Sequence, residues 1–145
     1  MKKFQFPLET VRKLRHHQWE LESMKLGAIR QEMAQLDEMG EQLRAWGDLE
    51  ENEVMRKSIL KPRELNSLDG FRAYLTKQEA RLEGLRAATA QRLAAQSQRL
   101  QEARRAAELL DKLKERAHQR WEKEINKQWD AFAEEVFISQ WRRNS

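Results

Sequence analysis

The chain has 145 residues, of which 36% are charged, and it contains only five glycines, two prolines and no cysteine. A chain without cysteine forms neither a disulfide nor a thiolate metal site, which is typical of proteins in a reducing compartment. Its 28 basic and 24 acidic residues are interspersed and leave a net charge of +4. Mixed charges of this kind usually cover the solvated faces of helices, so we expect no nucleic-acid partner.

The sequence shows no sign of export by a signal peptide or of a membrane span. Charged residues return at Glu9 and Arg12, before any signal-peptide apolar core could form, and no apolar run approaches the ~20 residues of a transmembrane helix. We therefore expect a cytoplasmic protein without a transmembrane segment.

A first helix is predicted over about residues 8–54. Pro7 at the first helical position, or Thr10 as the N-cap, would start it, and Gly40 and Gly47 would weaken it by about 1 kcal/mol each relative to alanine. Its apolar stripe drifts around the helix between an early and a late group, which indicates a stutter. The stripe comprises Val11, Leu14, Leu21, Ala28, Ile29, Met33, Leu36, Met39, Leu43 and Trp46.

A break is predicted over about residues 55–69. Pro62 disfavours the helical conformation of Lys61, and Asn66 or Ser67 is a suitable N-cap for a following helix.

The second helix, predicted over about 70–141, dominates the chain. From Phe71 to Trp141 there is no proline and one glycine, Gly84, and a helix of that length would extend roughly 100 Å. Its seam has the seven-residue spacing of a coiled coil: Leu75 and Leu82, then Leu93, Leu100, Ala107, Lys114 and Trp121, with a second row of Ala103, Leu110 and Ala117. Two such helices can cover each other's seams, so the sequence predicts one all-α domain, a long antiparallel two-helix coiled-coil hairpin.

The two arms of the predicted hairpin differ in length. With the bend near Lys61, residue i faces about residue 122 − i, so Phe4 lies opposite His118 and residues after Trp121 face no part of the first helix. Exposed aromatic side chains forgo about 1.5 to 3 kcal/mol each relative to burial, so an apolar end of this kind indicates a partner. Its apolar residues are Ile125, Trp129, Phe132, Val136, Phe137, Ile138 and Trp141.

Patterns typical of catalysis are missing. The three histidines have no metal-ligand spacing, and the chain has no glycine-rich phosphate loop and no nucleophile motif. We expect neither an enzyme nor a bound metal or cofactor. Trp19 and Trp46 are expected to fill the core, whereas Trp121, Trp129 and Trp141 are expected to bind a partner. The face from Phe71 to Leu85 fits core packing and partner binding equally well.

Three segments resemble the FliJ family, the small coiled-coil component of the bacterial flagellar type III export apparatus. These segments are Lys3 to Arg15, with its Phe-x-Phe-Pro-Leu lead before a Val-x-x-Leu repeat, Phe71 to Leu75 after a short break, and Leu110 to Arg142. The likeness extends over essentially the whole chain.

The resemblance implies a hairpin similar to the γ-subunit stalk of rotary ATPases. It implies binding to the centre of a FliI-like export ATPase ring, promotion of its hexamerisation and activity, contact with the FlhA-like export gate, and escort of export chaperones. The implied location is the inner face of the cell membrane at the flagellar base. The ATPase-facing residues carried over are Phe4, Phe6, Leu8, Trp129, Phe132, Phe137, Trp141 and Arg142. The gate-facing patch is Tyr74, Gln78, Arg81 and Leu85, where Gln78 and Arg81 are more polar than the family patch.

Two alternatives stay open at this point. The equivalent stalk of a virulence injectisome has the same architecture, and sequence alone does not separate the two systems. The second alternative is a generic coiled-coil adaptor or scaffold. Such a protein would dimerise through its apolar end and would not affect an ATPase.

Overall fold

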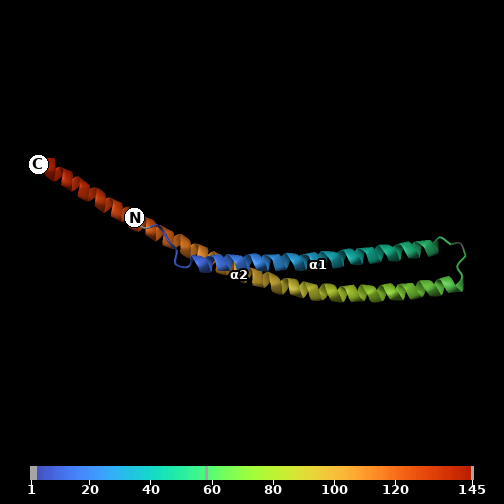
Figure 1. Ribbon diagram of the computed structural model, residues 1–145. Coiled ribbons are helices and arrows are strands. Elements are labelled where there is room, and N and C mark those ends of the chain that lie inside the picture. The colour runs from blue at the N-terminus through green and yellow to red at the C-terminus, as the bar shows by residue number, and fades with distance from the viewer. Residues whose placement is uncertain (1–2, 58, 145) are drawn as a thin grey trace. The chain divides into compact units, whose positions relative to one another are not determined.

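The structure is a computed structural model that describes residues 3–57 and 59–144. These residues form two α-helices and no strand: α1 (Glu9–Met55) and α2 (Pro62–Asn144). The helices run antiparallel to one another (Figure 1). The predicted pair of long antiparallel helices is therefore confirmed. The chain divides into two compact units, one made of residues 1–20 and 101–145 and the other of residues 21–100.

α1 begins two residues after the predicted proline start. Pro7 and Leu8 form a turn in which the Glu9 amide donates to the Phe6 carbonyl at 3.1 Å, and the Arg12 amide donates to the Leu8 carbonyl at 2.8 Å. The Leu8 carbonyl is thus the first acceptor of the helix, and neither Pro7 nor Thr10 takes the role expected of it. The α1 ladder passes through Gly40 without a break.

The connector is shorter than the sequence predicted. α2 begins at Pro62, whereas the break was expected to last to about residue 69, and Asn66 and Ser67 lie inside the helix, so the N-cap prediction is wrong. The Lys61 carbonyl accepts from the Glu64 amide at 3.0 Å and from the Leu65 amide at 3.3 Å. A proline in the first turn of a helix loses no hydrogen bond, because the N–H that it lacks has no intrahelical acceptor there. Residue 58, within the expected connector, lies outside the described residues.

In the unit formed by residues 21–100, a narrow seam holds the helices together. Leu26 and Ile29 of α1 are buried, as is Leu68 of α2, and Leu75 lies so close to Gly47 that a Cβ there would meet its Cδ1 at 2.8 Å. Ion pairs flank this seam, among them Arg92 Nη1 to Glu32 Oε2 at 2.7 Å.

The seam of this unit also contains buried polar side chains. Gln96, only 5% exposed, donates through Nε2 to the Glu22 backbone carbonyl at 3.1 Å and also to the Glu22 carboxylate. Thr89 donates instead to the Leu85 carbonyl of its own helix at 2.8 Å. Gln96 favours one register of the coiled coil, since sliding the helices would separate it from Glu22, whereas the bond of Thr89 within α2 is independent of register.

In the other unit, α2 residues Ala107 and Leu110 form the buried seam, at 0% and 8% exposure. The Phe4 ring lies edge-on to His118 with centroids 4.9 Å apart. This contact confirms the predicted register, in which residue i faces about residue 122 − i. No large side chain among the described residues is fully buried, so packing free energy is distributed along the seam.

Candidate partner-binding surface

The last part of α2 is exposed, as its sequence predicted. Ile125 is half-buried, and every described residue from 126 to 144 is exposed. Trp129 and Phe132 keep 51% and 58% of their surface in solvent, and Phe137 and Trp141 keep 69% and 66%. Figure 1 shows this red end of α2 continuing past the blue lead that precedes α1. Neighbouring large apolar side chains that are exposed together often mark a binding site.

The exposed apolar residues lie on two faces of α2. Ile125, Trp129, Phe132 and Val136 recur at intervals of four, three and four residues, which places them on one face of a helix. This face, here called the seam face, continues the row of Ala107 and Leu110 that packs on α1. Trp129 and Phe132 touch within it, with ring centroids 6.2 Å apart. Phe137 and Trp141 lie about 120 to 160° around the helix from the seam face.

The N-terminal lead meets α2 at the beginning of this exposed part. Besides its contact with His118, the Phe4 ring lies 5.9 Å from the Trp121 ring. Phe6 is half-buried and Leu8 is 42% exposed. Trp141 is a further 20 positions along α2 from Trp121, roughly 30 Å at the rise of an α-helix. The expected ATPase-facing residues therefore form two groups, one at Phe4 and one on the C-terminal end of α2.

A polar cluster joins the beginning of α1 to α2 next to the lead. Arg12 contacts Glu9 at 2.8 Å and Asp111 at 3.1 Å, and His16 Nε2 lies 2.8 Å from Asp111 Oδ1. Lys114 Nζ contacts the other Glu9 oxygen at 2.9 Å. Lys114 occupies a seam position of the heptad, and its ion pair explains why a cation is tolerated there.

This cluster lowers the pKa of both carboxylates. Hydrogen bonds from Arg12 and Lys114 lower the pKa of Glu9 from 4.5 to about 2. Burial raises the pKa of Asp111, but hydrogen bonds from His16 and Arg12 outweigh burial and lower it. The pKa of Arg12 is raised, first by Glu9 and then by Asp111. All three groups are therefore charged at neutral pH, which holds the start of α1 on α2.

The sequence interpretation missed the polar cluster, because it assigned the charged residues to the solvated faces of the helices. The predicted register contains a usable signal, since it places Arg12 within one residue of Asp111.

The expected gate-facing patch is divided between solvent and the contact with α1. Tyr74 is 48% exposed, but its ring lies 6.2 Å from the Trp46 ring. Leu85 is 45% exposed, Arg81 is exposed, and Gln78 is half-buried. Tyr74, Arg81 and Leu85 thus keep surface available for a partner.

The two remaining tryptophans, Trp19 and Trp46, contact the facing helix, but neither is buried, so the expectation that they fill the core is wrong. Trp46 packs edge-on to Phe71 with centroids 5.0 Å apart, although it stays 44% exposed. Trp19 is half-buried, with the Arg104 guanidinium 5.9 Å from its ring centroid.

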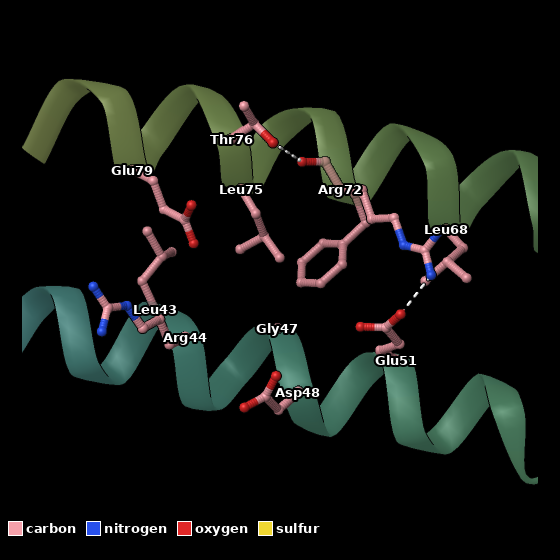
Figure 2. A pocket seen from close by; sticks show the side chains of 11 residues that line it. Leu43, Arg44, Gly47, Asp48, Glu51, Leu68, Arg72, Leu75, Thr76 and Glu79 are labelled. Carbon is pink, nitrogen blue, oxygen red and sulfur yellow. Dashed lines mark hydrogen bonds and ion pairs between the residues drawn. The ribbon is translucent and has the colours of Figure 1, made fainter. Parts of the chain in front are cut away.

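An open groove, rather than an enclosed cavity, lies beside Gly47. It has a volume of about 420 Å³. Figure 2 shows Leu75 pointing toward Gly47, with the Arg72 and Glu51 side chains paired across the helices. Charged side chains from both helices form much of its rim, including Arg44, Asp48 and Glu79.

No group of three or more His, Cys, Asp and Glu residues suited to a metal ion occurs in residues 3–57 and 59–144. Within the same ranges, neither helix has a stretch long and apolar enough to cross a membrane.

The chain was also compared with known proteins. No protein-family model, curated protein or solved structure matches it significantly.

Proposed function

We propose that the protein is the coiled-coil stalk of a type III protein export apparatus, similar in function to the FliJ family. In this proposal the apolar end of α2 enters the centre of a FliI-like export ATPase ring, as the γ subunit enters a rotary ATPase. The observation that carries the proposal is the exposure of Trp129, Phe132, Phe137 and Trp141 on a helix that has no α1 beside it. Residues 3–15, 71–75 and 110–142 resemble the FliJ family, and this resemblance is the reason for proposing an export ATPase as the partner.

Stimulation of the ATPase would come from selective binding. If the apolar end binds the assembled, hydrolysing ring more tightly than free subunits, binding shifts the population toward that ring by the difference in affinity. Trp and Arg are common interface anchors, so Trp129, Trp141 and Arg142 are the residues expected to contribute most. Phe4, Phe6 and Leu8 would contact the mouth of the ring, because Phe4 packs at Trp121, before the exposed part of α2.

A second contact would connect the ring to the FlhA-like export gate. Tyr74, Arg81 and Leu85 are the exposed members of the expected patch, and Gln78 lies between them. The proposal includes escort of export chaperones and places the protein at the inner face of the cell membrane, at the flagellar base. An injectisome stalk would use the same surfaces, and gene neighbourhood separates the two systems.

The test is the steady-state activity and oligomer distribution of the purified export ATPase, with and without this protein. The wild type should raise both the activity and the hexamer fraction. A Trp129→Ala, Phe132→Ala, Trp141→Ala variant should lose both effects. A matched control, Met24→Ala with Leu49→Ala, removes side chains that are 71% and 69% exposed elsewhere on the chain, and it should keep them. An unchanged ATPase with the wild type would refute the proposal.

A further inference from the structure

The N-terminal lead, residues 3–8, lies on α2 at the point where α1 stops. Phe6 precedes a proline, and a residue in that place is disfavoured in the helical conformation, so α1 does not extend further toward the N-terminus. Burial alternates along the lead instead: Phe4 and Phe6 are half-buried, whereas Lys3 and Gln5 are exposed. This alternation is typical of an extended segment with one face against its neighbour. The lead therefore covers the part of the α2 seam that an earlier start of α1 would have covered.

A cluster of three rings holds the lead on α2. The Phe4 ring lies edge-on to His118 at 4.9 Å and 5.9 Å from the Trp121 ring, and the His118 and Trp121 rings are 5.6 Å apart. All three residues are half-buried. Within the described part of the chain, residues 3–5 make no backbone–backbone hydrogen bond. Ring contacts, rather than backbone hydrogen bonds, therefore hold the first residues of the lead in place.

The start of α1 is attached to α2 by separate contacts. Glu9 accepts from Lys114 Nζ at 2.9 Å, and Arg12 Nη1 lies 3.1 Å from Asp111 Oδ1. On α2 these ion pairs precede the ring cluster by about one helical turn. Loss of the ring contacts would therefore leave both ion pairs, and with them the start of α1, in place.

We infer that the lead is a detachable strap, which shields Trp121 in the free chain and which leaves α2 on its own while α1 stays docked. Ordering the backbone of the lead costs conformational entropy at every residue, and the contacts of the half-buried Phe4 ring must offset most of that cost. The closed and open states are therefore close in free energy. Segments with few buried contacts open locally, well before the whole structure unfolds.

Opening of the strap lengthens the exposed apolar surface of α2. Trp121 lies four positions before Ile125, the first residue of the seam face, so an open strap adds one helical turn to that face. A partner that contacts Trp121 on this side must displace Phe4, and its contact with Trp121 shifts the population toward the open state. If the proposed function is correct, on which this step alone rests, opening frees Trp121 for the ring and Phe4 for its mouth.

Acrylamide quenching of Trp121 along a urea titration tests whether the strap opens separately. The full chain is used with Trp121 as its one tryptophan, the other four being replaced by phenylalanine, and far-UV circular dichroism is recorded on the same samples. Quenching of Trp121 should rise at urea concentrations below those at which the helix signal falls. In the protein that retains Trp19, which lies on α1, quenching should rise only together with the loss of helix.

A substitution in the lead tests the role of the Phe4 ring. Without urea, Phe4→Ala should raise the quenching of Trp121 to about the level of Trp129 in its own single-tryptophan protein, and it should leave the urea midpoint of the helix signal nearly unchanged. Gln5→Ala is the matched control, because Gln5 is exposed in the same lead, and it should behave as the parent protein. The inference is wrong if Trp121 becomes accessible only as the helices unfold, or if Phe4→Ala leaves its quenching unchanged. Both measurements use the chain alone, so their failure is distinct from a failure of the ATPase experiment.

Discussion

The close approach of Leu75 to Gly47 allows two opposing energies to be compared in one pair of variants. Gly40 and Gly47 both lie inside α1, so replacing either with alanine should gain about 1 kcal/mol of helix propensity. A Cβ at residue 40 would meet nothing within 4 Å, but a Cβ at residue 47 would meet Leu75 Cδ1 at 2.8 Å. The contact is with the terminal methyl group of Leu75, which must turn away from its preferred rotamer at a cost of about 0.5 to 1.5 kcal/mol. Gly47→Ala should therefore be less stable than Gly40→Ala by that amount.

Urea unfolding followed by far-UV circular dichroism measures the difference. Gly40→Ala should be about 1 kcal/mol more stable than the wild type, and Gly47→Ala should be within about 0.5 kcal/mol of the wild type. In a Leu75→Ala background the clash is absent, so Gly47→Ala should then stabilise as Gly40→Ala does. Equal stabilisation by both glycine substitutions in the otherwise native chain would show that the helices do not approach closely at Gly47.

Three further predictions concern the seam and the polar groups. Leu110→Ala, at a position only 8% exposed, should lower the free energy of unfolding by about 2 to 5 kcal/mol in urea titrations, whereas Phe137→Ala should leave it nearly unchanged at dilute concentration. Because the folded-state pKa of Glu9 is lowered from 4.5 to about 2, its ion pairs stabilise the fold above pH 4.5 and are lost as the pH falls toward 2. The stability difference between wild type and Glu9→Gln should shrink over that interval, and a difference that stays constant would contradict the ion pairing. Gln96→Ala should cost about 1 to 3 kcal/mol in thermal or urea unfolding, because it removes the donor to Glu22 and leaves a void in the seam.

Much of the fold was predictable, because heptad spacing and helix propensity agree along most of the chain. The register followed from the position of the bend, and the contact of Phe4 with His118 confirms it. The start of α2 was not predictable in the same way. Pro62 ends a helix when it lies inside one and begins a helix when it lies in the first turn. The sequence around it fits both, and the hydrogen bonds of the Glu64 and Leu65 amides to the Lys61 carbonyl show that Pro62 begins the helix.

The position of the candidate surface was predictable from the sequence. Its separation into one group of residues at Phe4 and another at the C-terminal end of α2 was not. The exposure of Trp129 and Phe132 followed from unequal arm lengths. Helical spacing separates Phe137 and Trp141 from the seam face, but it does not show that the lead stops at Trp121. The polar cluster around Asp111 was missed, because ion pairs depend on side-chain directions that a seam pattern does not contain.

The central claim is that the end of α2 is an apolar surface open to solvent in a single chain. Acrylamide quenching of single-tryptophan proteins, with the other four tryptophans replaced by phenylalanine, measures this directly at submicromolar concentration. The protein that retains Trp129 should be quenched nearly as efficiently as a short exposed peptide, and the protein that retains Trp19 should be quenched less. A Trp129 that is protected as well as Trp19 would contradict the account.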